Sequence, residues 1–284
     1  MDKKKKTLSI FTTVGPAGIW LSLLIVIPVL YVFIISFMQM ADKKMVYIFT
    51  LGNYRELISS LYFSVYFNSF KVALINTLIC IVAAYPMAYI MANASRRRKK
   101  LYMILLMLPF YTNLIIRLNG WKVILHQVGP LNEWLMNLGI IKEPITFMYT
   151  NGAITLGMVY SLLPFMVLPL ISSITNLDKT LLEASYDLGF GKIGTFFKVT
   201  LPLTKAGIFS GSIMVFIPTM AYFFVSDIMG GAKHKLIGNI IQTQFNSAYN
   251  WPLGAAFAIV LILLTLIMVA MYKKTGGDMD SLAL

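Results

Sequence analysis

The sequence predicts an all-α integral membrane protein with six transmembrane helices. Apolar residues of the set AVILMFWYC make up 58% of its 284 residues, whereas charged residues make up only 12%. A soluble domain carries about 25% charged residues because its surface faces water. With a mean hydropathy of +0.76, the chain has too little polar surface to cover a globule, and it therefore needs lipid.

Six apolar stretches reach or approach the length of a membrane crossing, which is about 20 residues in a helix. We expect one transmembrane helix in each of them: Ile19–Met38, Val72–Met91, Leu101–Ile116, Ala153–Leu177, Ala206–Ser226 and Trp251–Tyr272. The third is the shortest because it ends at Arg117, whose side chain would snorkel to the membrane interface. Prolines inside the stretches predict kinks that neighbouring helices stabilise.

The first stretch follows Lys3–Lys6 and has some features of a signal peptide. Its uncharged run, Thr7–Met40, is however much longer than the apolar region of a cleavable signal, which has about 7–15 residues. No clear A-x-A-like cleavage site closes the run. We therefore expect an uncleaved first transmembrane helix.

The basic residues predict the orientation of the helices. Most of the 24 lysines and arginines lie in four segments that would all be cytoplasmic: Lys3–Lys6, Arg96–Lys100, Asp178–Lys205 and Lys273–Lys274. Positive residues concentrate in cytoplasmic loops, so both termini are expected in the cytoplasm. This clustering also argues against nucleic-acid binding as the reason for the net charge of +13. The long outside segments, Gln39–Phe67 and Asn119–Gly152, are expected to form short interfacial helices.

The sequence offers no pattern for a metal site or for catalysis. Cys80 is the only cysteine, so the chain cannot form an internal disulfide. His126 and His234 are far apart and have no cysteine or carboxylate at ligand spacing. We expect no catalytic residue, no metal and no cofactor.

The segment between the fourth and fifth stretches predicts a helix–turn–helix on the cytoplasmic side. Asp178 is placed to cap the first helix, with Leu177 and Leu182 as a hydrophobic staple. Gly189 suits a left-handed helix end. A second amphipathic helix follows, and Pro202 is expected to end it before the fifth stretch.

The same segment contains a spaced motif. Glu183-Ala184-Ser185 is followed by three residues, Gly189, nine residues and Val199-Thr200-Leu201-Pro202. This pattern resembles the E-A-A loop of the permeases of ATP-binding-cassette (ABC) importers, which reads E-A-A, three residues, G, nine residues and I-x-L-P. The departures, serine for the second alanine and valine for isoleucine, are conservative.

This resemblance implies the type I ABC importer permease architecture. Residues 1–67 would hold the N-terminal tail, the first helix and an outside loop, 68–272 the permease core with its coupling loop 178–202, and 273–284 a cytoplasmic tail. The family loop docks on a separate ATPase subunit. The resemblance implies that the coupling loop includes Glu183, Ala184, Ser185, Gly189, Leu201 and Pro202. Of these, Glu183, Ala184 and Gly189 would form the surface that meets the ATPase. The competing interpretation is an ordinary amphipathic hairpin with solvated charges, which this residue set at this spacing disfavours.

A narrower resemblance covers essentially the second to the sixth stretch. Ser226–Lys233, Leu236–Asn239, Gln244-Phe245 and Trp251-Pro252 are similar to the spermidine/putrescine permeases of the PotB type. It implies that the chain pairs with a second permease, ATPase subunits and an extracytoplasmic binding protein in the cell membrane, and that it imports polyamines by alternating access. Relatives that import other cationic or small organic solutes share parts of this tract, so such a solute is the alternative.

A polyamine pathway needs carboxylates and aromatic faces to replace water around the ammonium groups. Asp227 follows Tyr222-Phe223-Phe224 near the outer end of the fifth stretch, and an acidic residue at membrane depth is a functional candidate. These four residues are the expected substrate pathway. Alternatively, Asp227 caps a helix or pairs with Lys233 or Lys235. Arg117 would repel a polycation and is expected to face lipid headgroups or a partner.

Other classes of membrane protein fit the sequence less well. A stand-alone secondary transporter would show inverted repeats or midplane charges in broken helices, and neither is visible. A membrane enzyme would need a constellation of His, Cys or carboxylate residues inside the spans. The chain has no G-x-x-x-x-G-K-[ST] loop, so ATP hydrolysis is expected in a partner.

Overall fold

The computed structural model describes residues 15–16, 18–41, 44–231 and 235–274. Expectations that concern Lys3–Lys6, Lys233, His234 and the C-terminal tail beyond Lys274 lie outside these residues. The chain divides into two compact units. One comprises Met1–Phe63 and Ile240–Leu264, and the other comprises Ser64–Asn239 and Thr265–Leu284.

The first unit contains an apolar helix followed by a small hairpin. The helix runs over Gly18–Ile35 and includes a π-helical turn, Ser22–Val26, before α2 (Ile27–Ile35). Strands β1 (Gln39–Ala41) and β2 (Lys44–Val46) pair antiparallel, and α3 (Gly52–Leu57) follows. The sequence predicts a short helix in this outside segment, which is confirmed, but it does not predict the hairpin.

Four helices of the described chain are long and apolar enough to cross a membrane. They are the Gly18–Ile35 helix, α4 (Ser60–Ala92), α8 (Asn151–Thr175) and the helix over Trp251–Lys273, which belongs to α15 (Trp251–Lys274). The count rises to six if each of two sharply bent helix pairs is one span. The all-helical membrane fold is therefore confirmed, while two of the six predicted spans are not single helices.

The third predicted span, Leu101–Ile116, is broken. A helix over Arg96–Tyr111, made of α5 (Arg96–Met107) and a 3-10 turn (Leu108–Tyr111), meets α6 (Leu114–Ile124) at 91°. The break has a local cause, because Thr112 is extended and the Asn113 side chain accepts a hydrogen bond from the Ile115 N–H at 2.8 Å. Asn113 thus caps a new helix instead of continuing the old one.

The fifth predicted span, Ala206–Ser226, is also interrupted. Helix α12 (Lys205–Ala221) ends at Tyr222, whose backbone is not helical, and α13 (Phe223–Gly230) follows. The returning chain passes close to this end, since a Cβ added at Gly238 would lie 2.2 Å from the carbonyl oxygen of Ala221. Only glycine permits that approach.

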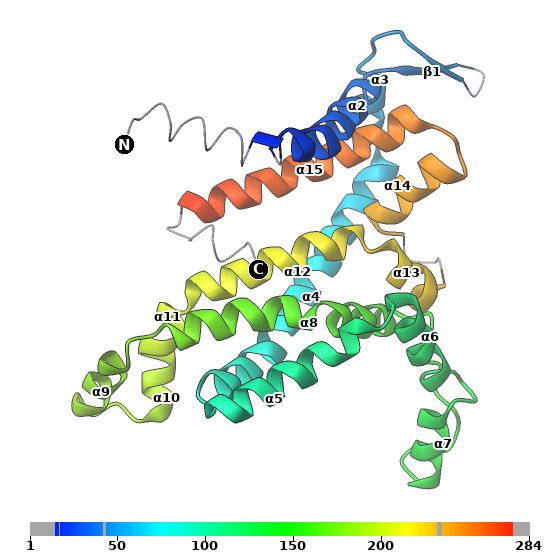
Figure 1. The fold of residues 1–284 in the computed structure, drawn as a ribbon. Coiled ribbons are helices and arrows are strands. Elements are labelled where there is room, and N and C mark those ends of the chain that lie inside the picture. The colour runs from blue at the N-terminus through cyan, green and yellow to red at the C-terminus, as the bar shows by residue number, and fades with distance from the viewer. Residues whose placement is uncertain (1–14, 17, 42–43, 232–234, 275–284) are drawn as a thin grey trace, which may run out of the picture. The chain divides into compact units, whose positions relative to one another are not determined.

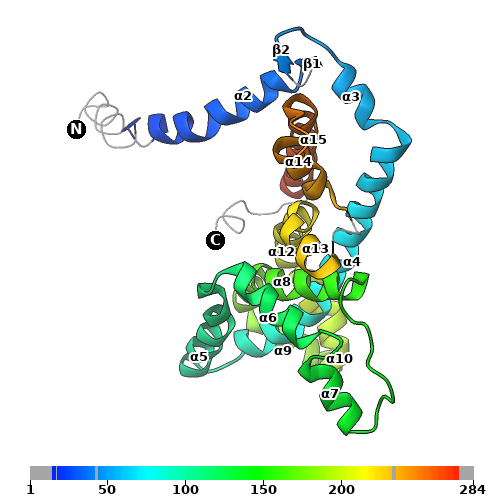
Figure 2. The same cartoon turned by 90° about the vertical axis from the view of Figure 1, so that its right-hand side faces the viewer.

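The core of the second unit lies between α4, α8 and α12, and α8 and α12 run side by side (Figures 1 and 2). Small residues of α12 face α8: a Cβ at Gly211 would lie 2.6 Å from the sulfur of Met166, and one at Gly207 2.5 Å from Cβ of Ser173. Such contacts let membrane helices pack closely. The loop after α8 lies at one end of this helix pair, and α6 and α13 lie at the other (Figure 1).

Candidate functional site

The loop between α8 and α12 begins with α9 (Lys179–Asp187), whose first turn is capped as predicted. Oδ1 of Asp178 accepts a hydrogen bond from the Thr180 N–H at 2.9 Å. Hydrogen bonds from the backbone and the side chain of Thr180 hold the pKa of the exposed Asp178 carboxyl below its usual value. The cap is therefore in its charged form at neutral pH.

Gly189 ends α9 in the left-handed conformation that the sequence predicts, with φ of +82°. The Phe190 N–H donates to the Ser185 carbonyl at 3.1 Å, and the Gly189 N–H donates to the Tyr186 carbonyl at 2.9 Å. This pair of bonds defines a Schellman motif. It turns the chain sharply and directs it into the next helical segment.

Ser185 joins the two helices of the loop. Its side chain is buried, and its Oγ lies 2.9 Å from Oγ1 of Thr195 in α10 (Lys192–Thr195). The serine that departs from the E-A-A pattern therefore makes a hydrogen bond that alanine would not make. Thr195 was missed in the sequence, where a single threonine among apolar residues carries no distinguishing signal.

The prediction that Pro202 ends the second helix is wrong. The helical segment continues from α10 through a π-helix (Phe196–Thr200) and α11 (Leu201–Leu203), and it breaks only at Thr204. Proline is tolerated in the first turn of a helix because an N–H at these positions has no acceptor within the helix, so its absence removes no hydrogen bond. The wide π turn before Leu201 places Pro202 at such a position.

Several side chains of the loop are exposed, and none of the residues that the structure describes covers them. Glu183 and Ala184 are exposed, and so are large apolar side chains, with Leu188 78% and Ile193 76% exposed. A pocket of about 420 Å³ lies beside them, lined by Tyr89, Tyr186, Lys192, Ile193, Phe196 and Phe197. Exposed apolar surface of this kind marks interaction sites.

The predicted pathway residues lie on or next to α13, at the opposite end of the α8–α12 pair (Figure 1). Tyr222 forms the break before α13. The rings of Phe223 and Phe224 are 4.0 Å apart and tilted by 31°, and the Phe224 side chain is exposed. Packing of Val225 and Met229 against α6 and α8 holds this short helix in place. The structure therefore brings aromatic faces and the Asp227 carboxylate onto one element.

Asp227 does not cap a helix. Its Oδ1 accepts a hydrogen bond from Nδ2 of Asn239 at 2.7 Å, and Oδ1 of Asn239 accepts one from the Leu236 N–H at 2.9 Å. Within the part of the chain that the structure describes, Asp227 forms no ion pair with Lys235 and its Oδ2 has no hydrogen-bond partner. The sequence does not predict Asn239 as a site residue, because it is one of several amide residues in the segment 236–246.

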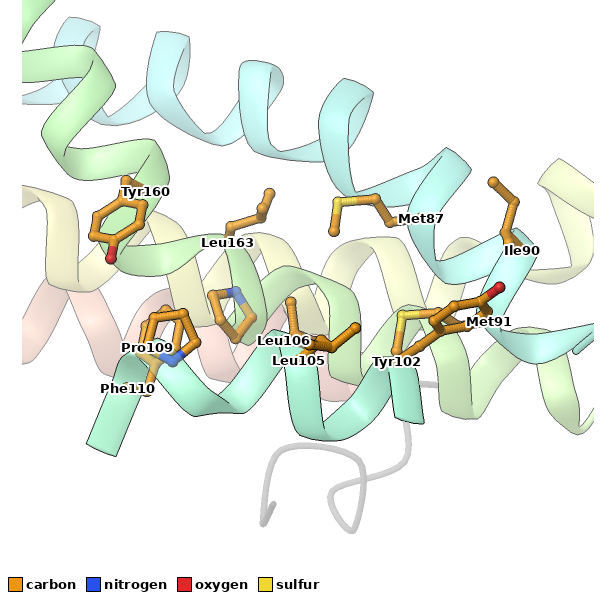
Figure 3. A pocket seen from close by; sticks show the side chains of 11 residues that line it. Met87, Ile90, Met91, Tyr102, Leu105, Leu106, Pro109, Phe110, Tyr160 and Leu163 are labelled. Carbon is orange, nitrogen blue, oxygen red and sulfur yellow. The ribbon is translucent and has the colours of Figure 1, made fainter. Parts of the chain in front are cut away.

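Arg117, which is expected to face lipid headgroups or a partner, packs against aromatic rings of its own chain. Its guanidinium carbon lies 4.5 Å from the ring centre of Phe110 and 5.5 Å from that of Tyr160. The same two rings line an apolar pocket of about 390 Å³ between α4, α5 and α8 (Figure 3). Nε and Nη1 of Arg117 are buried without a hydrogen-bond partner among the described residues. Cation–π contacts with these two rings thus stabilise the guanidinium charge.

These features together describe an all-helical membrane protein. It has an exposed helix–turn–helix loop at one end of the α8–α12 pair, and α13, with Asp227 and aromatic residues, at the other. Comparison with solved structures agrees on the fold. A chain of a bacterial alginate ABC transporter, in complex with a periplasmic protein, superposes with a TM-score of 0.75 over 94% of this chain and 93% of that one, at 15% identity. A chain of the MetNI methionine ABC transporter gives a TM-score of 0.54 over 77% of this chain and 97% of that one, at 15% identity.

Sequence comparison is more specific. The family model of the binding-protein-dependent transport system inner membrane component matches residues 84–274. The spermidine/putrescine transport system permease protein PotB of Escherichia coli K12 is 46% identical over 94% of this chain and 96% of its own length. That of Haemophilus influenzae is 42% identical over 90% of each.

The chain belongs to this inner-membrane component family, among the PotB-like ABC permeases. It is therefore a non-catalytic, multi-pass subunit of the inner membrane, and permeases of this class work with an ATPase and a binding protein.

Proposed function

We propose that this chain is the permease subunit of a polyamine importer, that it forms a heterodimer with a second permease, and that both of its termini are cytoplasmic. The core would span residues 68–272, and the loop 178–202 would receive the ATPase. The similarity to spermidine/putrescine permeases over nearly the whole chain carries the substrate assignment.

The loop geometry supports the coupling role. Glu183 and Ala184 are exposed on a helix that is capped at both ends and clamped to the next helix by Ser185. A rigid, partly apolar surface is suited to transmit the movement of a partner, since it loses little conformational freedom on docking. Gly189 forms the turn that ends this helix, and Leu201 and Pro202 lie in α11, at the end of the loop next to the membrane core.

The outer element supports the substrate class. Asp227 offers one carboxylate oxygen that no described residue occupies. It lies on the same short helix as Phe223 and Phe224, which Tyr222 precedes. An ammonium group is stabilised by this combination of a carboxylate and π faces. Asn239 orients the carboxylate, so the site is preorganised for a cation.

Uptake of labelled solutes into vesicles that contain the assembled complex tests the substrate. Spermidine and putrescine are expected to accumulate when ATP is supplied, whereas choline, a cation with a single charge, is not. Accumulation of choline with neither polyamine would overturn the polyamine assignment and leave the permease assignment intact.

A further inference from the structure

Thr204 lies at the junction between the coupling loop and the membrane core. The helical segment Lys192–Leu203 meets α12 at 64°, and Thr204 is the single residue between them, with φ of −95° and ψ of 9°. Its side chain is completely buried. Any rotation of the loop relative to α12 must therefore pass through this residue.

The Thr204 hydroxyl is bound from two sides. Its Oγ1 donates to the carbonyl of Thr200 at 2.9 Å and is 3.2 Å from that of Leu201, and it lies 2.8 Å from the hydroxyl of Tyr85. A hydroxyl has one hydrogen and two acceptor lone pairs. Either hydroxyl can be the donor in the bond between Tyr85 and Thr204, and Oγ1 of Thr204 has the capacity to bond to Tyr85 and to these carbonyls.

Tyr85 belongs to α4, so this bond ties the second span to the junction. The Tyr85 ring also packs edge-on against Phe196 of the coupling loop, with 5.3 Å between ring centres and an angle of 88°. Pro86 follows directly in the same helix and leaves the carbonyl of Val82 without its helical partner. Tyr85 thus contacts the loop at the point where the following proline makes α4 easiest to bend.

We propose that the Tyr85–Thr204 hydrogen bond is a latch that makes α4 follow the coupling loop when the ATPase moves it. This inference rests on the proposed function, in which the loop 178–202 receives the ATPase. Tyr85 is a positioning residue and touches no substrate. With the latch, the loop moves both α4 and α12, whereas without it the loop rotates about Thr204 and moves α12 alone.

The test measures the amount of spermidine imported per ATP hydrolysed by the complete complex in vesicles. Tyr85→Phe keeps the ring against Phe196 and removes only the hydroxyl of Tyr85, while Thr204→Val removes the other hydroxyl of the bond at nearly the same volume. Each is expected to lower the ratio about fivefold, as for the loss of one buried hydrogen bond. Thr204→Ser keeps the hydroxyl and is expected to retain the wild-type ratio.

A matched control lies on the same two helices. Nδ2 of Asn76 in α4 donates to Oγ1 of Thr219 in α12 at 2.7 Å, and Thr219 is as buried as Thr204 and bonds to its own helix in the same way. Thr219→Val is expected to reduce thermal stability without changing the ratio. Thermal stability and the ratio are measured separately. If the Tyr85–Thr204 bond has only a structural role, its loss lowers thermal stability and leaves the ratio unchanged.

Each remaining outcome is decisive. An unchanged ratio in Tyr85→Phe and Thr204→Val, with a normal wild-type ratio, overturns the latch and leaves the proposed function standing. An equal fall of the ratio in Thr219→Val also overturns it. If the wild-type complex imports no spermidine, the proposed function fails and the latch fails with it.

Discussion

Gly189 holds the turn of the coupling loop in a conformation that few residues adopt. Its φ of +82° lies in the left-handed region, and a Cβ at this position would meet no atom within 4 Å. A side chain at position 189 would therefore cost free energy only through the left-handed backbone conformation, not through a steric clash with other residues. Gly191, two residues later, has an ordinary φ of −73° and equally open surroundings.

This pair gives a controlled prediction. Gly189→Ala is expected to destabilise the loop by about 1–2 kcal/mol, the cost of left-handed backbone for a residue with a Cβ. Gly191→Ala is expected to have little effect. Thermal unfolding of the purified complex, together with ATP-dependent uptake, checks both. Equal effects of the two substitutions would show that the left-handed turn is not what Gly189 provides.

Asp227 gives a second prediction about a single residue. Asp227→Asn keeps an oxygen to accept the hydrogen bond of Asn239 and removes the charge, so we expect assembly to remain normal. Polyamine uptake should fall about tenfold, as for the loss of an interaction of roughly 1.4 kcal/mol with a cation. The initial rate of spermidine uptake at low concentration is the measurement.

The control for this substitution is Glu133→Gln, which neutralises an exposed carboxylate in α7 (Pro130–Asn137) and is expected to leave uptake unchanged. If Asp227→Asn imports spermidine at the wild-type rate, the carboxylate has only a structural role in holding Asn239.

At the level of elements, the contact between α8 and α12 depends on small residues. A Cβ at Gly211 would lie 2.6 Å from the sulfur of Met166 and 3.2 Å from two of its backbone atoms. Because backbone cannot move aside as a side chain can, α12 would have to shift away from α8. Gly120 in α6 is also helical, but a Cβ there would meet nothing within 4 Å.

Opposite effects are therefore expected from the same substitution in two helices. Gly211→Ala should destabilise the protein by about 1–3 kcal/mol through overpacking, whereas Gly120→Ala should stabilise it by up to about 1 kcal/mol because alanine favours the helix. Thermal unfolding in detergent compares them. A stabilising Gly211→Ala would contradict the close packing of the two helices.

The elements also show how far the sequence could predict the fold. Hydropathy over about 20 residues located all six apolar stretches, because membrane crossing depends on composition. It could not locate the breaks at Thr112 and Tyr222, which depend on single contacts: the cap by Asn113 and the passage of Gly238 against Ala221. The sequence alone could have indicated the helix cap at Asn113. It could not indicate that Gly238 contacts Ala221, because the two residues are distant in the sequence and only folding brings them together.

In both candidate sites, local features could be predicted from the sequence, whereas contacts between distant residues could not. The caps of α9 by Asp178 and Gly189 were predicted because they are local. The partners Thr195 of Ser185 and Asn239 of Asp227 were not predicted, since each pair is 10 or more residues apart and only folding brings its members together. The helix through Pro202 was mispredicted because the preceding π turn changes where the proline falls.

At the scale of the whole molecule, the second unit places the loop with α9 and α10 at one end of the α8–α12 pair and α13 at the other (Figure 1). Helix α13 carries Phe223, Phe224 and Asp227. The sequence contains no phosphate-binding loop, and in the proposed function the energy for transport enters through the loop 178–202. We therefore expect that the chain does not move its substrate alone.

Spermidine uptake into vesicles, compared with and without the ATPase subunits, measures this dependence directly. The complete complex is expected to accumulate labelled spermidine only when ATP is present on the side of the ATPase, and the two permeases without the ATPase are expected to accumulate none. Accumulation by this chain in the absence of the ATPase, driven by an ion gradient or by the membrane potential, would contradict the account.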